Sequence, residues 1–196
     1  MPDFRDLTLY LIRHGECEHN VERRIGSHDD SPLTEKGRMQ ARSNGRLLRD
    51  VAGRLDDLDF FASSLHRTCT SMELLRDELG LPPTSYRADH RLMEFNAGDH
   101  IWMKWDDIPH EHHAAFEADP WNASRPGGES QASVYARVGR FLRTLVRDSV
   151  IVTHAVPVLA IRAHYLGLSP EDALGYHHPN AGLLRLAQGT ESYFGD

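Results

Sequence analysis

Short apolar runs and longer amphipathic stretches alternate along most of this 196-residue sequence. The strand-like runs lie at residues 7–12, 58–62, 149–153 and 182–186. The stretches with helical spacing lie at about residues 34–52, 65–79, 130–147, 155–166 and 170–175. Alternation of this kind is typical of α/β proteins. We therefore predict a three-layer sandwich, in which a mostly parallel central sheet carries helices on both faces.

The helical pattern is clearest at residues 130–147. Its apolar residues are spaced to form one stripe, made of Val134, Val138, Phe141, Leu142, Leu145 and Val146. Gly127-Gly128-Glu129-Ser130 supplies a turn and a candidate helix cap in front of it. Between about residues 95 and 126 the periodicity gives way to Trp, His, Pro and Asp. We expect an irregular excursion near the site there, within a single domain that spans residues 1–196.

Composition narrows the classes of partner. The formal charge of −7 argues against a nucleic-acid binder or a protein that docks on anionic membranes. The two cysteines, Cys17 and Cys69, have no zinc or redox spacing. The amino terminus lacks a signal-peptide pattern, and the longest apolar stretch is interrupted by Thr153, His154 and Pro157. We predict a cytoplasmic protein with no nucleic-acid or membrane partner, and its oligomeric state stays open.

Polar residues follow the predicted strands at the points where they end. Arg13-His14-Gly15-Glu16 closes the first strand, with Asn20 shortly after, and Val152-Thr153 leads into His154. Ser63 follows the second strand and opens a helix that carries Arg67. A parallel sheet would gather these residues at one edge, where ligands of open α/β sheets bind. Together with helix amino termini, two arginines and two histidines make a site for a dianion, of which phosphate is the obvious case.

This set resembles the histidine phosphatase superfamily, in its phosphoglycerate-mutase-like branch 1. The resemblance runs from Leu9 to about Leu186. Beyond the Arg-His-Gly-Glu tetrapeptide, the matching elements are Asp30-Ser31-Pro32-Leu33-Thr34 with Gly37, Gln40 and Ala41, Ser63-x-Leu65-x-Arg67-Thr68, Leu92-x-Glu94, Gly127-Gly128-Glu129-Ser130 and Val152-Thr153-His154. The fold it implies is the phosphoglycerate-mutase-like sandwich.

The resemblance also implies roles for six residues. His14 would be the nucleophile, Glu94 the general acid, and Arg13, Arg67, His154 and Asn20 the groups around the phosphoryl oxygens. Elementary chemistry agrees, because a neutral imidazole is a competent nucleophile near pH 7 and preorganised cations stabilise the phosphoryl transition state. Glu94 must carry a proton to act as the acid. No metal or cofactor is required, and the expected partner is a small phosphorylated metabolite.

The sequence departs from the family pattern at three places. Cys17 stands where threonine or serine is usual, so a weaker hydrogen-bond donor faces the phosphate edge. Ala155-Val156 follows His154 where glycines are common, and Gly98-Asp99-His100-Ile101-Trp102 replaces Gly-Asp-Trp-Glu-Gly after Glu94. These changes leave the chemistry intact and put the identity of the substrate in doubt.

We expect a metal-independent phosphatase that hydrolyses a small phosphate monoester through phosphohistidine. A phosphoglycerate-type mutase is disfavoured because the chain is shorter than typical mutases and lacks their Arg-His-Tyr-Gly pattern after Glu94. The excursion at 95–126 would hinder a phosphatase acting on phosphorylated protein. A non-catalytic phosphate-binding protein ranks lowest, since all the residues that the family resemblance assigns to the reaction are present in the sequence.

Other histidines and tryptophans carry weaker signals. His110-Glu111-His112-His113 and His177-His178 lack the spacing of a closed zinc site, so solvated histidines are expected, with one of the later pair allowed at the pocket mouth. Trp102, Trp105 and Trp121 are expected to pack the excursion, and contact between one of them and the substrate stays open.

Overall fold

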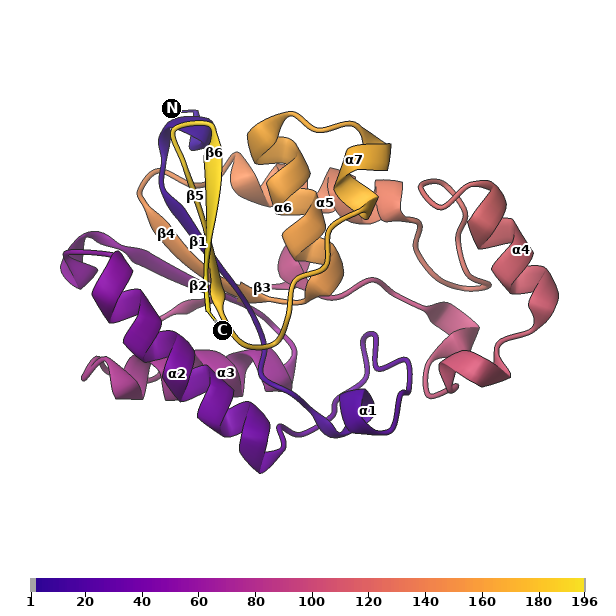
Figure 1. Cartoon of the computed structure of the whole chain (residues 1–196), viewed down its shortest axis with the longest axis horizontal. Coiled ribbons are helices and arrows are strands. Elements are labelled where there is room, and N and C mark those ends of the chain that lie inside the picture. The colour runs from indigo at the N-terminus through magenta and orange to yellow at the C-terminus, as the bar shows by residue number, and fades with distance from the viewer. Residues whose placement is uncertain (1–2, 196) are drawn as a thin grey trace.

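The computed structural model describes residues 3–195, which build a six-stranded sheet in the order β3-β2-β4-β1-β5-β6 (Figure 1). The strands are β1 (Leu9–Arg13), β2 (Asp59–Ser63), β3 (Arg87–Asp89), β4 (Ser149–Thr153), β5 (Leu183–Ala187) and β6 (Thr190–Phe194). The first four strands run parallel, and β5 and β6 are antiparallel to their neighbours. The predicted α/β class with a mostly parallel sheet is confirmed.

Helices cover both faces of the sheet, with α2 and α3 on one side and α5 and α6 on the other (Figure 1). The helices are α1 (Glu18–Val21), α2 (Glu35–Val51), α3 (His66–Glu78), α4 (His110–Ala118), α5 (Gln131–Leu142), α6 (Ala155–Leu166) and α7 (Pro170–Leu174). Alternate residues of β1 pack on opposite faces: Leu9 and Leu11 join the cluster of α5 and α6, whereas Tyr10 and Ile12 join that of α2 and α3. Burial on both faces explains why the strand reads as a continuous apolar run.

Side-chain caps begin α2, α5 and α7, whereas α3 and α6 start without one. The side chain of Thr34 accepts a hydrogen bond from Gly37 N at the start of α2, and that of Ser130 accepts one from Ser133 N at the start of α5. Ser169 does the same for α7, with Pro170 in the first turn. These caps satisfy backbone donors that a helix start leaves free.

The helix predicted at 130–147 ends earlier than expected. α5 stops at Leu142, and both the backbone N–H and the hydroxyl of Thr144 donate to the Phe141 carbonyl. A threonine hydroxyl that takes a carbonyl in this way competes with the helical ladder. Leu145 remains buried, but Val146 is 51% exposed, so its place in the apolar stripe was wrong.

The elements that the sequence pattern missed carry little apolar signal. β3 and β6 are the two edge strands, and neither contains a fully buried residue. Within the excursion at 95–126, α4 forms a regular helix none of whose residues is buried, so only part of that segment is irregular. Figure 1 shows this segment extending beside the sheet. The single-domain boundaries stay a prediction.

None of the helices in residues 3–195 combines the length and the apolar character that a membrane crossing requires.

Candidate active site

The carboxyl ends of three parallel strands bring distant residues together. β4 lies between β1 and β2, so His14 after β1, Ser63 at the end of β2 and His154 after β4 meet at one edge. The rings of His14 and His154 stand edge to face with their centroids 5.1 Å apart, and both residues are buried. The expected convergence of the two histidines is therefore present.

One ring nitrogen of His14 is hydrogen-bonded to the backbone. Its Nδ1 lies 2.7 Å from the carbonyl oxygen of Gly15, which can only accept, so Nδ1 carries the proton and donates. In the neutral ring the lone pair then resides on Nε2. The main chain of His14 is held as well, since its N–H donates to the Thr153 carbonyl and its carbonyl accepts from the Asn180 side chain.

Gly15 lets the loop after β1 pack directly on α2. A Cβ at this position would lie 2.1 Å from the carbonyl oxygen of Gly37, and one on Gly37 would lie 2.0 Å from that of Glu16. The Gly15 N–H donates to the Ser71 hydroxyl. The absence of a side chain at Gly15 thus allows a close approach to the backbone of α2. Both glycines are required for one backbone contact beneath the nucleophile.

Burial keeps both site histidines neutral. Loss of hydration places the pKa of His14 well below its ordinary value, and the charges of Arg67 and Arg13 lower it further. Burial likewise lowers the pKa of His154, followed by the charge of Arg67. His154 Nε2 lies 2.9 Å from the Ser63 hydroxyl, while its buried Nδ1 has no hydrogen-bond partner among the described residues. A neutral His14 retains the lone pair that a nucleophile needs.

Arg13 and Arg67 keep their full positive charge at the site, because their hydrogen-bond partners are neutral carbonyl groups. Arg67 donates to the carbonyls of Asp29 at 2.7 Å and Ser27 at 2.6 Å, and Arg13 donates to the carbonyl of His178 at 3.1 Å. Neutral carbonyls orient a guanidinium group without removing its charge. Burial lowers the pKa of both groups, and arginine nevertheless stays protonated. The pair therefore forms a fixed positive surface.

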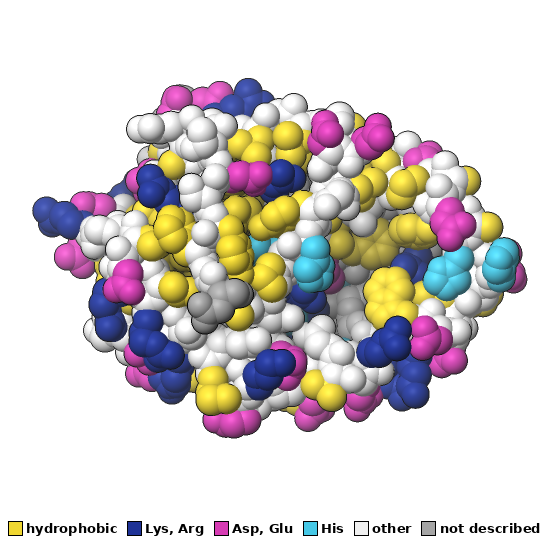
Figure 2. All heavy atoms as spheres, viewed as in Figure 1, with side chains coloured by type: hydrophobic (Ala, Val, Ile, Leu, Met, Phe, Trp, Pro, Cys, Tyr) yellow, Lys and Arg dark blue, Asp and Glu magenta, His cyan; other side chains and the backbone are white. Residues whose placement is uncertain are grey.

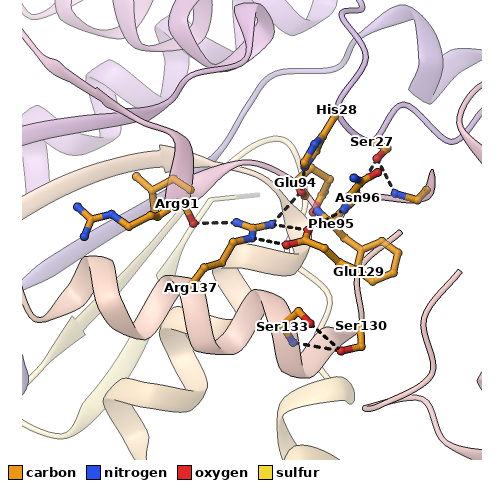
Figure 3. Close-up of polar contacts among 12 residues, drawn as sticks. Ser27, His28, Arg91, Glu94, Phe95, Asn96, Glu129, Ser130, Ser133 and Arg137 are labelled. Carbon is orange, nitrogen blue, oxygen red and sulfur yellow. Dashed lines mark hydrogen bonds and ion pairs between the residues drawn. The ribbon is translucent and has the colours of Figure 1, made fainter. Parts of the chain in front are cut away.

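Glu94 is held by its own turn and by three other elements. Its Oε1 accepts from the N–H of Phe95 at 2.9 Å and from that of Val156 at 3.2 Å, in the first turn of α6. Its main-chain carbonyl accepts from His28 Nε2 at 2.7 Å and from Arg137 Nη2 at 2.9 Å (Figure 3). With Oε1 engaged in this way, Oε2 is the oxygen available to a ligand.

These side chains line one small cavity of about 60 Å³. Its walls are Arg13, His14, Cys17, His19, Asn20, Gly26, Ser27, Arg67 and Glu94. The side chain of Asn20 accepts at Oδ1 from Cys17 N at 3.1 Å and from Cys17 Sγ at 3.2 Å, which leaves its amide N–H groups as donors. Figure 2 shows a hollow on this face of the molecule. In Figure 1 the same region is surrounded by α1, the segment after α7 and the excursion.

Comparisons with known proteins agree with this geometry. The model of the histidine phosphatase superfamily (branch 1) matches residues 9–193. The chain belongs to this superfamily. It is 34% identical over 170 residues to the Erwinia tasmaniensis protein named "Probable phosphoglycerate mutase GpmB", covering 83% of this chain and 76% of that one. It is 29% identical to the Saccharomyces cerevisiae fructose-2,6-bisphosphatase, covering 93% of this chain but only 40% of the yeast protein.

Among solved structures, the α-ribazole phosphatase from Shigella flexneri superimposes with a TM-score of 0.80 at 26% identity. The match covers 96% of this chain and 95% of the Shigella chain. Named relatives thus include both phosphatases and a mutase, so membership of the superfamily leaves the particular reaction and substrate open.

Five of the six predicted site residues line the cavity, namely Arg13, His14, Asn20, Arg67 and Glu94. His154 contacts the His14 ring and Ser63 instead of forming part of the wall. Their roles in the reaction remain proposals. In the part of the chain that the structure describes, no cluster of three or more His, Cys, Asp or Glu side chains is arranged to hold a metal ion.

The structure adds residues that sequence patterns did not assign. Ser27, Asp29 and His178 supply the carbonyls that hold the arginines, and every residue carries such a carbonyl, so no side-chain pattern could reveal them. Arg137 is anchored to Glu129 of the Gly-Gly-Glu-Ser turn at 2.9 Å. That turn was assigned from the sequence as a helix start and as a family motif, with no role toward Glu94.

The expectation of solvated histidines was wrong at His178, and His112 and His113 are only partly exposed. His178 is buried, donates or accepts at Nδ1 with the Tyr176 hydroxyl, and supports Arg13 through its carbonyl. His112 is half-buried, with its Nδ1 2.7 Å from Nε2 of the buried His100. The tertiary contacts of the excursion and of the segment after α7 cover these rings, whereas His110 and His177 are exposed.

Proposed function

We propose that this histidine phosphatase hydrolyses a small phosphate monoester through a phosphohistidine on His14, without a metal. The observation that carries the proposal is the neutral His14 imidazole, with Nδ1 held by Gly15 and Nε2 left with the lone pair, between two arginines in one cavity. A nucleophile beside preorganised cations is what phosphoryl transfer requires.

In the first step His14 Nε2 attacks phosphorus, and the bond from phosphorus to the alcohol oxygen breaks. Arg13 and Arg67 stabilise the charge on the equatorial oxygens, and the amide of Asn20, which also lines the cavity, donates to them. A protonated Glu94 gives its proton to the leaving alkoxide. In the second step Glu94 takes a proton from a water that attacks phosphorus, which releases inorganic phosphate and restores neutral His14.

The decisive experiment is hydrolysis of 4-nitrophenyl phosphate in the presence of a chelator. Wild-type protein, His14→Ala and the matched control His66→Ala, which alters an exposed histidine on α3, are compared. We expect wild type and His66→Ala to be active and His14→Ala to lose activity by at least about a thousandfold. Rapid quench with radiolabelled ester should trap phosphate on wild type and on His66→Ala only. Activity that survives in His14→Ala, or that the chelator abolishes, contradicts the mechanism.

Mutase chemistry is the second candidate, because a relative with 34% identity carries a mutase name. A mutase must keep the phosphohistidine long enough for a phosphorylated product to turn over and accept the group. Incubation of the phosphoenzyme with 3-phosphoglycerate separates the two reactions. Release of inorganic phosphate supports the phosphatase, and formation of 2-phosphoglycerate supports the mutase.

A further inference from the structure

The catalytic cavity has room for the phosphoryl group but not for a whole ester. Its volume of about 60 Å³ is far below the roughly 300 Å³ at which pockets enclose complete organic ligands. The alcohol part of any substrate must therefore lie outside the cavity, against whatever forms its rim. The residues at the rim then decide which alcohols are accepted.

One wall of the cavity leads directly to an exposed aromatic ring. His19 lines the cavity and is buried, and its ring meets that of Trp102 edge to face with the centroids 4.4 Å apart. Gly26 packs closely on the His19 ring, since a Cβ at this position would lie 2.6 Å from His19 Nδ1. Trp102, on the outer side of this contact, is 51% exposed.

The backbone holds Trp102 in an unfavourable conformation. Its φ of 73° lies in the left-handed region, which large side chains seldom adopt. The conformation is maintained from both sides, since Trp102 N donates to the Ile25 carbonyl at 3.0 Å and the Trp102 carbonyl accepts from Arg24 Nη1 at 2.8 Å. Strain of this kind that the surroundings maintain is concentrated at ligand clamps and active sites.

Arg24, which holds the Trp102 carbonyl, and its neighbour Arg23 each face a carboxylate. Arg24 contacts Glu22 at 2.6 Å, and Arg23 contacts Asp106 at 3.5 Å. Because Arg24 is engaged by both Glu22 and the Trp102 carbonyl, it is a poor site for a second acidic group of a substrate. The half-exposed indole of Trp102 offers an apolar, planar face instead. Lys104 is exposed and lies two residues after Trp102 in the sequence. If the substrate's alcohol carried a carboxylate, Lys104 is the residue that would bind it.

We propose that Trp102 determines specificity by stacking on the alcohol part of the substrate, so that the preferred class is monoesters of alcohols carrying an aromatic or other planar apolar group. This rests on the proposed function, because it assumes that the phosphoryl group occupies the cavity. Trp102 makes no contact with the reacting atoms, and its effect is confined to the alcohol.

The test uses 2-phenylethyl phosphate and ethyl phosphate, whose leaving groups are both primary alkoxides. In wild type we expect kcat/KM to favour the phenylethyl ester. Trp102→Ala should lower that value roughly tenfold while changing ethyl phosphate less than about twofold, and Trp102→Phe should retain most of the preference. Trp105→Ala, which removes an equally exposed tryptophan of the excursion, is the matched control and should leave the preference unchanged.

Binding of the non-hydrolysable 2-phenylethylphosphonate and ethylphosphonate, measured by calorimetry, gives a readout that needs no turnover. We expect Trp102→Ala to weaken the first and not the second, and Trp102→Gly to do the same in a backbone that tolerates positive φ. The proposal is overturned if both phosphonates weaken equally, if Trp105→Ala has the same effect, or if 3-phosphoglycerate is preferred and Lys104→Met removes that preference. Failure of the proposed function is seen separately, as turnover that does not depend on His14.

Discussion

Arg137 on α5 donates a hydrogen bond of 2.9 Å to the main-chain carbonyl of Glu94. The same guanidinium group donates to the Arg91 carbonyl at 2.7 Å and pairs with Glu129, whose carboxylate in turn accepts from Asn96 N (Figure 3). The turn that carries the proposed general acid is thus tied to a helix on one face of the sheet.

Loss of the Arg137 hydrogen bond should impair proton transfer by Glu94 more than it weakens phosphate binding. We expect Arg137→Leu to lower kcat at least about tenfold while the inhibition constant of inorganic phosphate changes little, because Arg13 and Arg67 have other anchors. The variant should also lose roughly 2–3 kcal/mol of stability, since Glu129 and two carbonyls lose a partner. Steady-state kinetics and urea unfolding measure both effects. Arg140→Leu, on the exposed side of α5, is the control, and an equal loss of phosphate binding in Arg137→Leu would contradict the prediction.

Protonation of the site histidines should occur well below pH 6.5. Burial, with the charge of Arg67, lowers the pKa of both His14 and His154 in the folded protein, so both rings stay neutral while unfolded histidines, near 6.5, take up protons. NMR titration of ¹⁵N-labelled histidine in the ligand-free protein checks this against the same protein in urea. Because the unfolded state binds more protons below pH 6.5, these two groups make stability fall as the pH decreases through that value. Titration of either ring near 6.5 in the folded protein would refute the assignment.

Ser27 should couple the phosphate site to the excursion. It adopts a positive φ of 44°, and its carbonyl accepts a hydrogen bond from Arg67. Its hydroxyl donates to the Phe95 carbonyl and accepts from Ala97 N, both at 2.8 Å. Ser27→Ala keeps the backbone strain and leaves two buried main-chain groups unpaired, so we expect a loss of about 2–4 kcal/mol in thermal or urea unfolding. Ser130→Ala, which removes only a helix cap, should cost about 1 kcal/mol. Equal losses in the two variants would show that the Ser27 hydroxyl has no special part.

A hydroxyl at position 17 should strengthen phosphate binding. Cys17 is buried at the cavity wall, and its thiol is a weaker donor than a serine hydroxyl. We expect Cys17→Ser to lower the inhibition constant of inorganic phosphate by roughly two- to fivefold. Cys69→Ser is the control, since the thiol of Cys69, on α3, contacts the Ser63 carbonyl at the end of β2 and does not line the cavity. Weaker phosphate binding in Cys17→Ser would mean that the thiol fits this wall better than a hydroxyl.

Much of the site was readable because the relevant patterns are local. A strand buried on both faces reads as an apolar run, and β1, β2 and β4 begin and end within two residues of the predicted bounds. Since parallel strands align their carboxyl ends, the positions of His14 and His154 followed from where those runs stop. The exposed edge strand β6 and the unburied helix α4 gave no such signal.

The sequence by itself determined the fold class, because burial and strand ends leave a periodic record in the chain. Its motifs also identified the superfamily and five of the residues that line the cavity. Only the tertiary structure decided which carbonyls orient Arg13 and Arg67, that Arg137 holds the turn of Glu94, and that Trp102 rather than another tryptophan meets the cavity wall at His19. Main-chain carbonyls are the same in every residue, and a long-range contact depends on how loops pack. Neither leaves a pattern along the chain.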